Sequence, residues 1–192
     1  MTTVDIRSTV ATPVALTALF NNTGIAASRW PTTGAFNIWA NTFPSEDLPA
    51  AGSTVDVGGV PFLFPGAPTG APDNVRCRGQ EVPVPVGSYD WVYALAAAER
   101  RSEDLVLVRY ADGSGRRQWL RVSDFWPETP ARFGERTAFH CGRMLYPRHS
   151  QPGMAPAIWR CRMPVAVPGR VRALVLPDNP AIHVFALTAV RL

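Results

Sequence analysis

The residues best suited to chemistry lie together in the segment FHCGRMLYPRH, from Phe139 to His149. Imidazole acts as a general acid or base near neutral pH, and guanidinium groups bind carboxylate or phosphate through paired hydrogen bonds. The segment therefore makes His140 or His149 a candidate acid–base residue and Arg143 a candidate contact for an anionic substrate. Tyr146 is a candidate ligand-binding side chain in the same segment.

Two histidines and Cys141 also raise the question of a zinc site, with Cys161 as a fourth ligand. The spacing matches no compact zinc pattern, and no His-x-His pair holds two ligands on one strand face. We therefore expect no metal, and nothing indicates another cofactor. A cysteine nucleophile is an alternative. Because adjacent strand residues point to opposite faces, this would pair Cys141 with His149 rather than His140, or use Cys161.

Tryptophan side chains are the second group of candidates. An exposed indole ring stacks on the flat face of a sugar or aromatic ligand, whereas a buried ring needs only a partner for its N–H. Trp30 and Trp39 lie in an irregular N-terminal region, Trp126 is expected in the core or at its rim, and three lie in predicted strands: Trp91, Trp119 and Trp159. His183 and Asp124 are expected to be structural.

The charge pattern argues against nucleic acid as a partner. All 19 basic residues are arginine, and the formal net charge is +4. This charge is small and the arginines are scattered, whereas a nucleic-acid footprint is a concentrated basic patch. The absence of lysine fits a GC-rich coding bias, and alternatively an anion-binding surface.

The cysteines and the N-terminus bear on location. Cys77, Cys141 and Cys161 form no disulfide framework, because their number is odd and their spacing is irregular. No basic stretch precedes an apolar run near the N-terminus, and VALTALF is too short to span a bilayer. We expect a cytoplasmic protein with no membrane partner.

These candidate residues must be positioned by strands. The segment LVLVRYADGSGRRQWLRVSDFW, residues 105–126, alternates apolar and polar residues on both sides of an Asp-Gly turn, which predicts a β-hairpin. Residues 54–64, 80–86 and 89–95 read as further strands, as do IWRCRMPV, VRALVLP and IHVFALTAV near the C-terminus. Only LAAAERRSED, near 95–104, suggests a helical turn or two.

About nine or ten short strands, with 19 prolines and 15 glycines, predict an all-β fold: a two-layer antiparallel β-sandwich of the jelly-roll or galactose-binding-like kind. We expect an N-terminal tail at 1–13 and a single domain over 14–192, with a first strand near 14–20. Residues 127–156 are expected to be a long irregular segment.

Several segments, in this order, resemble a known module. They are FNNTGI at 20–25, FNIWANTFPSEDLPAAG at 36–52, VDVGGVPFLFP at 55–65, APDNV at 71–75, VRYADGS at 108–114, VSDFW at 122–126 and HVFALTAV at 183–190. Together they look like the β-sandwich accessory domain that lies beside catalytic domains in secreted bacterial glycoside hydrolases, including α-mannosidase-like enzymes. The resemblance implies carbohydrate binding or structural support of a hydrolase. It implies no catalytic residues.

The chain departs from that module where bulky side chains replace small ones. The module's FDGxG loop is FNIWA here, and aromatic residues at Tyr89 and Trp91 replace a Gly/Ala-rich stretch. We place the ligand site at these departures, the 36–41 loop and the Tyr89–Trp91 strand, together with the 140–149 segment. The predicted ligand contacts are Trp39, Tyr89, Trp91, Arg143 and Tyr146.

Three functions remain open. The first is a free-standing module that binds carbohydrate or a small anionic or aromatic molecule. The second is a β-sandwich cyclase, lyase or isomerase of bacterial secondary metabolism, with a histidine acid–base and an arginine anion contact. The third is a subunit that docks on an enzyme partner. A shallow aromatic platform would favour binding, and a deeper pocket with histidine or carboxylate at its base would favour an enzyme.

Overall fold

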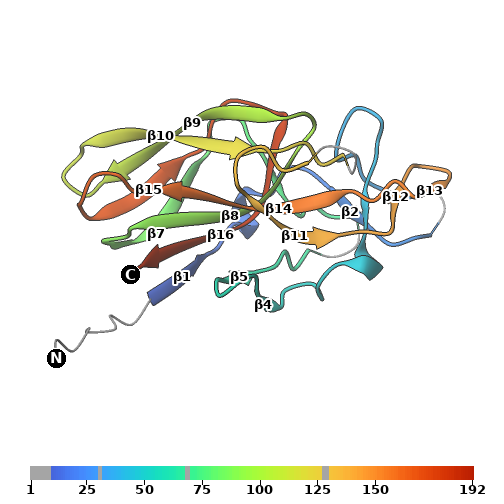
Figure 1. The fold of residues 1–192 in the computed structure, drawn as a ribbon, viewed down its shortest axis with the longest axis horizontal. Helices are drawn as coiled ribbons and strands as arrows, with labels where there is room; N and C mark the ends of the chain where they lie inside the picture. The colour runs from blue at the N-terminus through green and yellow to red at the C-terminus, as the bar shows by residue number, and fades with distance from the viewer. Residues whose placement is uncertain (1–9, 30–31, 68–69, 127–129) are drawn as a thin grey trace.

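The computed structural model describes residues 10–29, 32–67, 70–126 and 130–192. Within these ranges the chain forms sixteen strands and two 3-10 helices, η1 (Thr17–Leu19) and η2 (Ser45–Asp47), and no α-helix. The strands form two main sheets that pack face to face (Figure 1). The predicted antiparallel β-sandwich is confirmed.

The larger sheet has six strands in the order β1-β16-β8-β14-β11, with β6 also paired to β16. All of its pairs are antiparallel. Its strands are β1 (Val10–Val14), β6 (Val75–Arg76), β8 (Trp91–Ala98), β11 (Arg136–His140), β14 (Ala157–Pro164) and β16 (Ile182–Arg191). The closing strand β16 is therefore central, and it joins both ends of the chain in one sheet.

The smaller sheet has four strands in the order β10-β9-β15-β7. They are β7 (Glu81–Gly87), β9 (Ser102–Tyr110), β10 (Gly115–Val122) and β15 (Val171–Val175). The predicted hairpin is β9–β10. It is closed by a hydrogen bond from the Tyr110 backbone N–H to the carbonyl of Ser114, and Gly113 at its turn has a φ of 87°. Its alternation is confirmed, because Val106, Val108 and Leu120 are buried while Trp119 is exposed.

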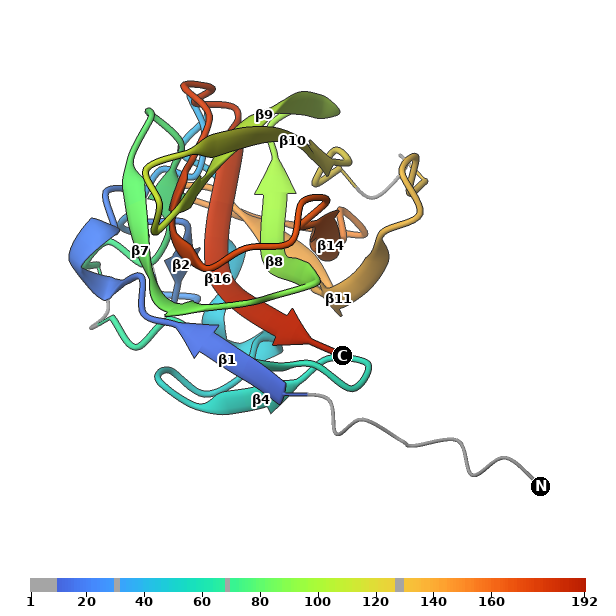
Figure 2. The same cartoon turned by 90° about the vertical axis from the view of Figure 1, so that its left-hand side faces the viewer.

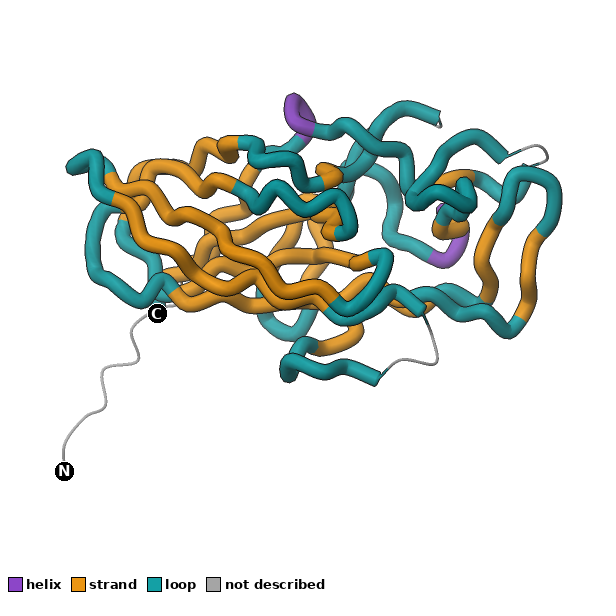
Figure 3. The backbone as a smooth tube through the Cα atoms, turned by 90° about the horizontal axis from the view of Figure 1, so that it is seen from above, coloured by secondary structure: helices purple, strands orange, loops and turns teal. Residues whose placement is uncertain are grey.

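Three two-stranded pairs lie outside the main sheets: β2 (Ile25–Ala26) with β3 (Phe43–Pro44), β4 (Thr54–Asp56) with β5 (Pro61–Leu63), and β12 (Arg143–Leu145) with β13 (Ser150–Pro152). The pair β2–β3 is parallel. Viewed along the sandwich, β4 lies on the side of β16 and β8 away from β9 and β10 (Figure 2). From above, loops gather at the end that carries β12 and β13 (Figure 3).

The central strands of the six-stranded sheet, β8 and β16, are largely buried on both faces. One face packs on the smaller sheet around residues such as Val92, Leu187 and Leu174. The other face, with Leu95 and Phe185, packs against a second cluster drawn from the loops and short strands. This explains the nearly continuous apolar runs of β8 and β16, because a strand covered on both faces has no solvent-facing row of residues.

Three expectations about local structure are wrong. The first strand is β1 (Val10–Val14), which begins before the predicted boundary because it pairs along β16. The stretch near 95–104 holds no helix: Ala96 to Ala98 complete β8, and β9 begins at Ser102, because the buried sheet overrides the helix propensity of alanine. The 127–156 segment includes β11, β12 and β13 rather than being irregular throughout.

Within the described ranges, we find no helix that is long and apolar enough to cross a membrane. The cysteines Cys77, Cys141 and Cys161 are all buried free thiols.

Candidate functional site

The loop from Phe36 to Asn41 presents two large apolar side chains to solvent. Ile38 is 80% exposed and Trp39 is 68% exposed. The side-chain oxygen of Asn37 accepts hydrogen bonds from the backbone N–H groups of Trp39 (3.0 Å) and Asn41 (3.3 Å). The sequence therefore folds here into a tight turn whose polar residue faces inward and whose apolar residues face outward.

The same loop is anchored at its base. Phe36 is fully buried, and its ring contacts those of Phe43 and Phe125 edge-on at centroid distances of 5.2 and 5.1 Å. Ala40 has a φ of 53°, and it is the only non-glycine with positive φ among the described residues. Such a conformation costs an L-residue roughly 1 kcal/mol. A strained, anchored loop with exposed apolar residues at its tip is the pattern of a contact surface.

This loop forms one wall of a cleft of about 650 Å³. The other walls come from the turn after β8, the segment after β10, and the start of the β12–β13 connection. We call it the aromatic cleft. Its lining residues are Asn37, Ile38, Trp39, Asn41, Glu99, Arg100, Asp124, Phe125, Trp126, Tyr146 and Ala181.

Tyr146 brings the 140–149 segment to this cleft. Its hydroxyl lies 3.6 Å from the sulfur of Met154, and its ring is stacked on that of His149, with centroids 4.6 Å apart and planes 5° from parallel. A backbone hydrogen bond from Tyr146 to the carbonyl of His149 (2.8 Å) closes the turn between β12 and β13. His149 therefore supports Tyr146 and is not itself among the lining residues.

Trp126, which the sequence placed in the core or at its rim, is 37% exposed and forms another aromatic wall of the cleft. Asp124 fixes this segment: its carboxylate accepts the backbone N–H of Trp126 (3.0 Å), and its carbonyl accepts the indole N–H of the buried Trp159 (2.9 Å). Phe125 donates its backbone N–H to Ala98 at the end of β8. Asp124 thus organises the turn, as the sequence suggested, and also lines the cleft.

Glu99 follows β8 and supplies a carboxylate to the cleft wall. Its Oε1 accepts a hydrogen bond from Nη2 of Arg76 at 2.6 Å, and the same oxygen lies 3.4 Å from Nε2 of His183. His183 is fully buried, and its Nδ1 lies 2.9 Å from the side-chain oxygen of Asn74. Its ring also contacts that of Phe36, with centroids 4.2 Å apart. Phe36, which anchors the loop of Trp39, therefore also contacts the histidine that lies behind Glu99.

Burial shifts the acid–base balance of His183. Burial lowers the pKa of this imidazole, the positive charge of Arg76 lowers it as well, and the hydrogen bond and negative charge of Glu99 oppose them. The net shift is downward, which favours the neutral ring. His183 was expected to be structural, and its burial agrees with that role. It also contacts Glu99, which lines the cleft.

Two predicted ligand residues lie away from the aromatic cleft. The hydroxyl of Tyr89 donates to the carbonyl of Pro85 (2.7 Å) and closes the turn between β7 and β8. Trp91 starts β8, and the guanidinium of Arg162 lies 5.1 Å from its ring centroid. Trp91 lines a different hollow of about 240 Å³, together with Trp119.

Arg143 and His140 are also outside the aromatic cleft. Arg143 donates from Nη2 to the hydroxyl of Ser28 (3.0 Å), and Ser28 in turn bonds both carboxylate oxygens of Glu46. Arg143 therefore ties β12 to the N-terminal loops. His140 is the exposed last residue of β11, paired with Ala157. Trp30 lies outside the described residues.

The cysteines offer little nucleophilic chemistry. Burial raises the pKa of the Cys141 thiol to about 12, and burial also raises the pKa values of Cys77 and Cys161. A thiol that stays protonated is a poor nucleophile and a poor metal ligand. Among the described residues, no group of three or more His, Cys, Asp or Glu side chains is placed to hold a metal ion.

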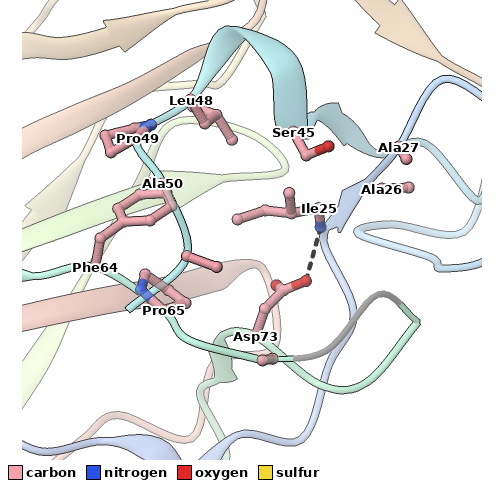
Figure 4. A pocket seen from close by; sticks show the side chains of 12 residues that line it. Ile25, Ala26, Ala27, Ser45, Leu48, Pro49, Ala50, Phe64, Pro65 and Asp73 are labelled. Carbon is pink, nitrogen blue, oxygen red and sulfur yellow. Dashed lines mark hydrogen bonds between the residues drawn. The ribbon is translucent and has the colours of Figure 1, made fainter. Parts of the chain in front are cut away.

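A third hollow, also of about 240 Å³, lies between the loops near β2, η2 and β5 (Figure 4). Its walls are mostly alanine, proline and other apolar side chains, with Asp73 as its acidic residue. Both Asp73 oxygens are occupied by backbone N–H groups, from Gly24 and Ile25, each at 2.9 Å. Because this carboxylate holds β2 in place, we assign it a structural role.

The structure thus brings together two of the predicted ligand residues, Trp39 and Tyr146, and separates them from Tyr89, Trp91 and Arg143. Sequence reasoning did not single out Glu99, Arg100 or Arg76. A cue was present, since a charged pair directly ends the apolar run of β8, but only the fold shows that His183 lies behind it.

Comparison with protein families gives one result. No match was found among curated proteins. The family model described as the AziU2-like beta-sandwich domain matches residues 10–192, from the first residue of β1 to the C-terminus. The match covers all the described strands, including those that build the aromatic cleft. The chain therefore belongs to the AziU2-like beta-sandwich domain family.

Proposed function

We propose that the protein binds a small molecule with a flat face in the aromatic cleft, with carbohydrate as the leading ligand class. The observation that carries the proposal is the exposed indole of Trp39 on an anchored loop, across a hollow of about 650 Å³ that Trp126 and Tyr146 also line. Tryptophan and tyrosine rings stack on the apolar faces of sugars, and their polar ends serve hydroxyl groups.

Polar groups at the same cleft support this ligand class. Asn37, Asp124 and Arg100 line it beside the aromatic residues, and between them they offer hydrogen-bond donors and acceptors. A cleft with aromatic walls and a few polar groups is the usual composition of a small-molecule site. Glu99 and Asp124 are acidic and Arg100 is basic, so the cleft suits a neutral polar ligand better than the strongly anionic one expected from Arg143.

Two further observations support the ligand class and the location of the protein. The resemblance to accessory domains of glycoside hydrolases supports carbohydrate over other flat ligands. Three buried free thiols fit a reducing compartment, which supports a cytoplasmic location.

The experiment is a binding screen with tryptophan variants. Isothermal titration with a panel of glucose, mannose, galactose, N-acetylglucosamine and glucuronate tests the wild type. We expect Trp39→Ala and Trp126→Ala each to weaken binding about tenfold, since losing one stacking contact costs roughly 1 kcal/mol or more.

The matched control is Trp119→Ala. Trp119 is 49% exposed on β10 and lies outside the aromatic cleft. It should bind the panel as the wild type does. Equal losses for Trp39→Ala and Trp119→Ala, or a wild type that binds none of the sugars, would contradict the proposal.

A further inference from the structure

The contacts of Asn74 fix the protonation of His183. The side-chain nitrogen of Asn74 lies within 3.1 Å of three acceptors: the backbone carbonyl of Asn22, the side-chain oxygen of Asn22 and Oδ1 of Asp73. That end of the amide must therefore be the NH2 group, and the other end is the oxygen. Because this oxygen faces Nδ1 of His183 at 2.9 Å, Nδ1 must carry a hydrogen.

The hydrogen on Nδ1 determines whether the other ring nitrogen, Nε2, donates or accepts a hydrogen bond. In a neutral imidazole with hydrogen on Nδ1, Nε2 is an acceptor. Nε2 faces Oε1 of Glu99 at 3.4 Å, and an ionised carboxylate is also only an acceptor. Two acceptors do not attract one another, so this contact is favourable when Nε2 also carries a proton.

The other contacts of Glu99 leave one oxygen for the cleft. Both Arg76 and His183 contact Oε1. In the part of the chain that the structure describes, no hydrogen bond is formed by Oε2. Since Glu99 lines the aromatic cleft, Oε2 is the oxygen available to a bound ligand.

We propose that Glu99 is the acid–base residue of the aromatic cleft and that the buried His183 positions it. The inference rests on the proposed function in that a ligand must occupy the cleft. It makes the cleft a site of proton transfer: Glu99 removes a proton from a C–H or O–H group of the ligand, and Arg100, the next residue, stabilises the negative charge that forms. The substrate class is a flat polar molecule with an acidic proton.

The proposed acid–base and anion-binding residues differ from those predicted from the sequence. His140 and His149 were the candidate acid–base groups and Arg143 the anion contact, and none of them lines the cleft. Glu99 and Arg100 line the cleft and offer an acid–base group and an anion contact there, and His183 lies buried behind Glu99. The charged groups around His183 are Arg76 from β6, Glu99 from the end of β8 and Asp73, which reaches it through Asn74.

The first test needs no ligand. Long-range ¹H–¹⁵N NMR of the histidine rings between pH 5 and 8 reports which nitrogen of His183 carries hydrogen. We expect Nδ1–H throughout, and we expect Glu99→Gln to lower the pKa of His183 further, because Glu99 is the group that raises it. A ring with hydrogen on Nε2 alone, or an unchanged titration in Glu99→Gln, overturns the pairing.

The second test uses 5-nitrobenzisoxazole, a flat carbon acid, as the probe. A base removes the proton from its C3 atom, the C–H electron pair completes a nitrile, the N–O bond breaks, and the oxygen leaves as a coloured phenolate. No oxidant or reductant is needed. We expect the protein to accelerate this reaction over buffer, and Glu99→Gln to lower kcat at least tenfold, since general bases contribute on the order of 100-fold or more.

The control is Glu103→Gln. Glu103 is a surface residue of β9 that pairs with Arg121 at 2.9 Å, outside the cleft. Its kcat should equal that of the wild type. No acceleration over buffer, or full activity in Glu99→Gln, overturns the acid–base role.

The same assay separates this inference from the proposed function. Trp39→Ala should raise KM and leave kcat within about twofold, because it removes a binding contact shared by ground and transition states. If KM does not change in Trp39→Ala while Glu99→Gln still loses activity, the aromatic binding role fails and the acid–base role stands.

Discussion

The two faces of the six-stranded sheet are covered in different ways. One face packs against the regular strands β7, β9, β10 and β15, and the cluster between the sheets is almost wholly apolar. The other face is covered by loops and short strands, which form the aromatic cleft. The buried polar residues on this side are His183, from β16 itself, and Asn74, directly before β6. On the first face, pairing between strands satisfies the backbone hydrogen-bonding groups. On the second face, side chains such as Asp73 accept hydrogen bonds from backbone N–H groups that have no strand partner.

The difference between the two faces indicates which of them can carry a ligand site. On the regular face the side chains that point inward are mostly apolar, because few partners are available for a polar group. On the loop-covered face, irregular backbone leaves donors and acceptors that polar side chains must satisfy, and the same side chains can reach a ligand. We therefore expect substitutions on the two faces to separate stability from binding.

The largest expected effect comes from matched truncations on the two faces. Phe36→Ala removes a buried ring that contacts Phe43, Phe125 and His183, and should lower the free energy of unfolding by about 4 kcal/mol. It should also abolish binding in the cleft, because Phe36 anchors the loop of Trp39. Leu174→Ala, in β15, should cost about 3 kcal/mol and leave binding by folded protein unchanged. Urea denaturation and titration calorimetry measure both quantities. Equal binding by the two variants would remove the distinction between the faces.

The next effect is a pH dependence from Asp73. Burial raises the pKa of this carboxyl from 3.8 to about 6, although hydrogen bonds from Asn74, Gly24 and Ile25 favour its ionised form. The folded protein therefore binds the proton more tightly than the unfolded chain. The stability that this contributes is present below about pH 4 and is lost as the pH rises through 6, a change of about 3 kcal/mol.

Asp73→Asn tests this dependence. The variant should have a constant offset in stability, because an amide cannot accept all the hydrogen bonds that the carboxylate accepts. The difference in unfolding free energy between wild type and variant should vary between pH 4 and 6 and be flat from pH 7 to 8. A difference that does not vary across the lower window would show that the Asp73 pKa is the same in both states.

A smaller effect is expected at the hairpin turn on the regular face. Gly113 has a φ of 87°, and no atom lies within 4 Å of the position that a Cβ would occupy. Gly113→Ala should therefore cost only the backbone strain, about 1 kcal/mol, with ligand binding unchanged. Thermal unfolding gives the cost. A change in binding would mean that the hairpin communicates with the cleft.

The smallest effect on stability should come from Trp39, the proposed main ligand contact. Trp39 is largely exposed, so Trp39→Ala should change the unfolding free energy by less than about 0.5 kcal/mol. Trp159→Ala should cost about 4 kcal/mol, because that ring is buried and its N–H is bonded to Asp124. A large loss of stability in Trp39→Ala would mean that its loop is part of the scaffold.

Much of the fold was predictable from local pattern. The β9–β10 hairpin follows from alternation on both sides of an Asp-Gly turn, and β4–β5, β7, β14, β15 and β16 follow from similar runs. The errors fall where tertiary packing overrides local preference. Ala96 to Ala98 have helical propensity but lie in a fully buried strand, and the 140–149 segment, read as irregular, is partly ordered by pairing between β12 and β13.

The sequence by itself determined the all-β class and the hairpin, because alternation is a local signal. It also singled out Trp39, from the bulky residues of the 36–41 loop, and Tyr146, from the 139–149 segment. Only the tertiary structure decided which of them meet. Trp39, Trp126 and Tyr146 are far apart in the chain and share one cleft, while Trp91 and Arg143 face elsewhere. The pairing of Glu99 with His183 likewise depends on β8 lying beside β16. Sheet order and loop packing set these contacts, and neither is encoded in the spacing of neighbouring residues.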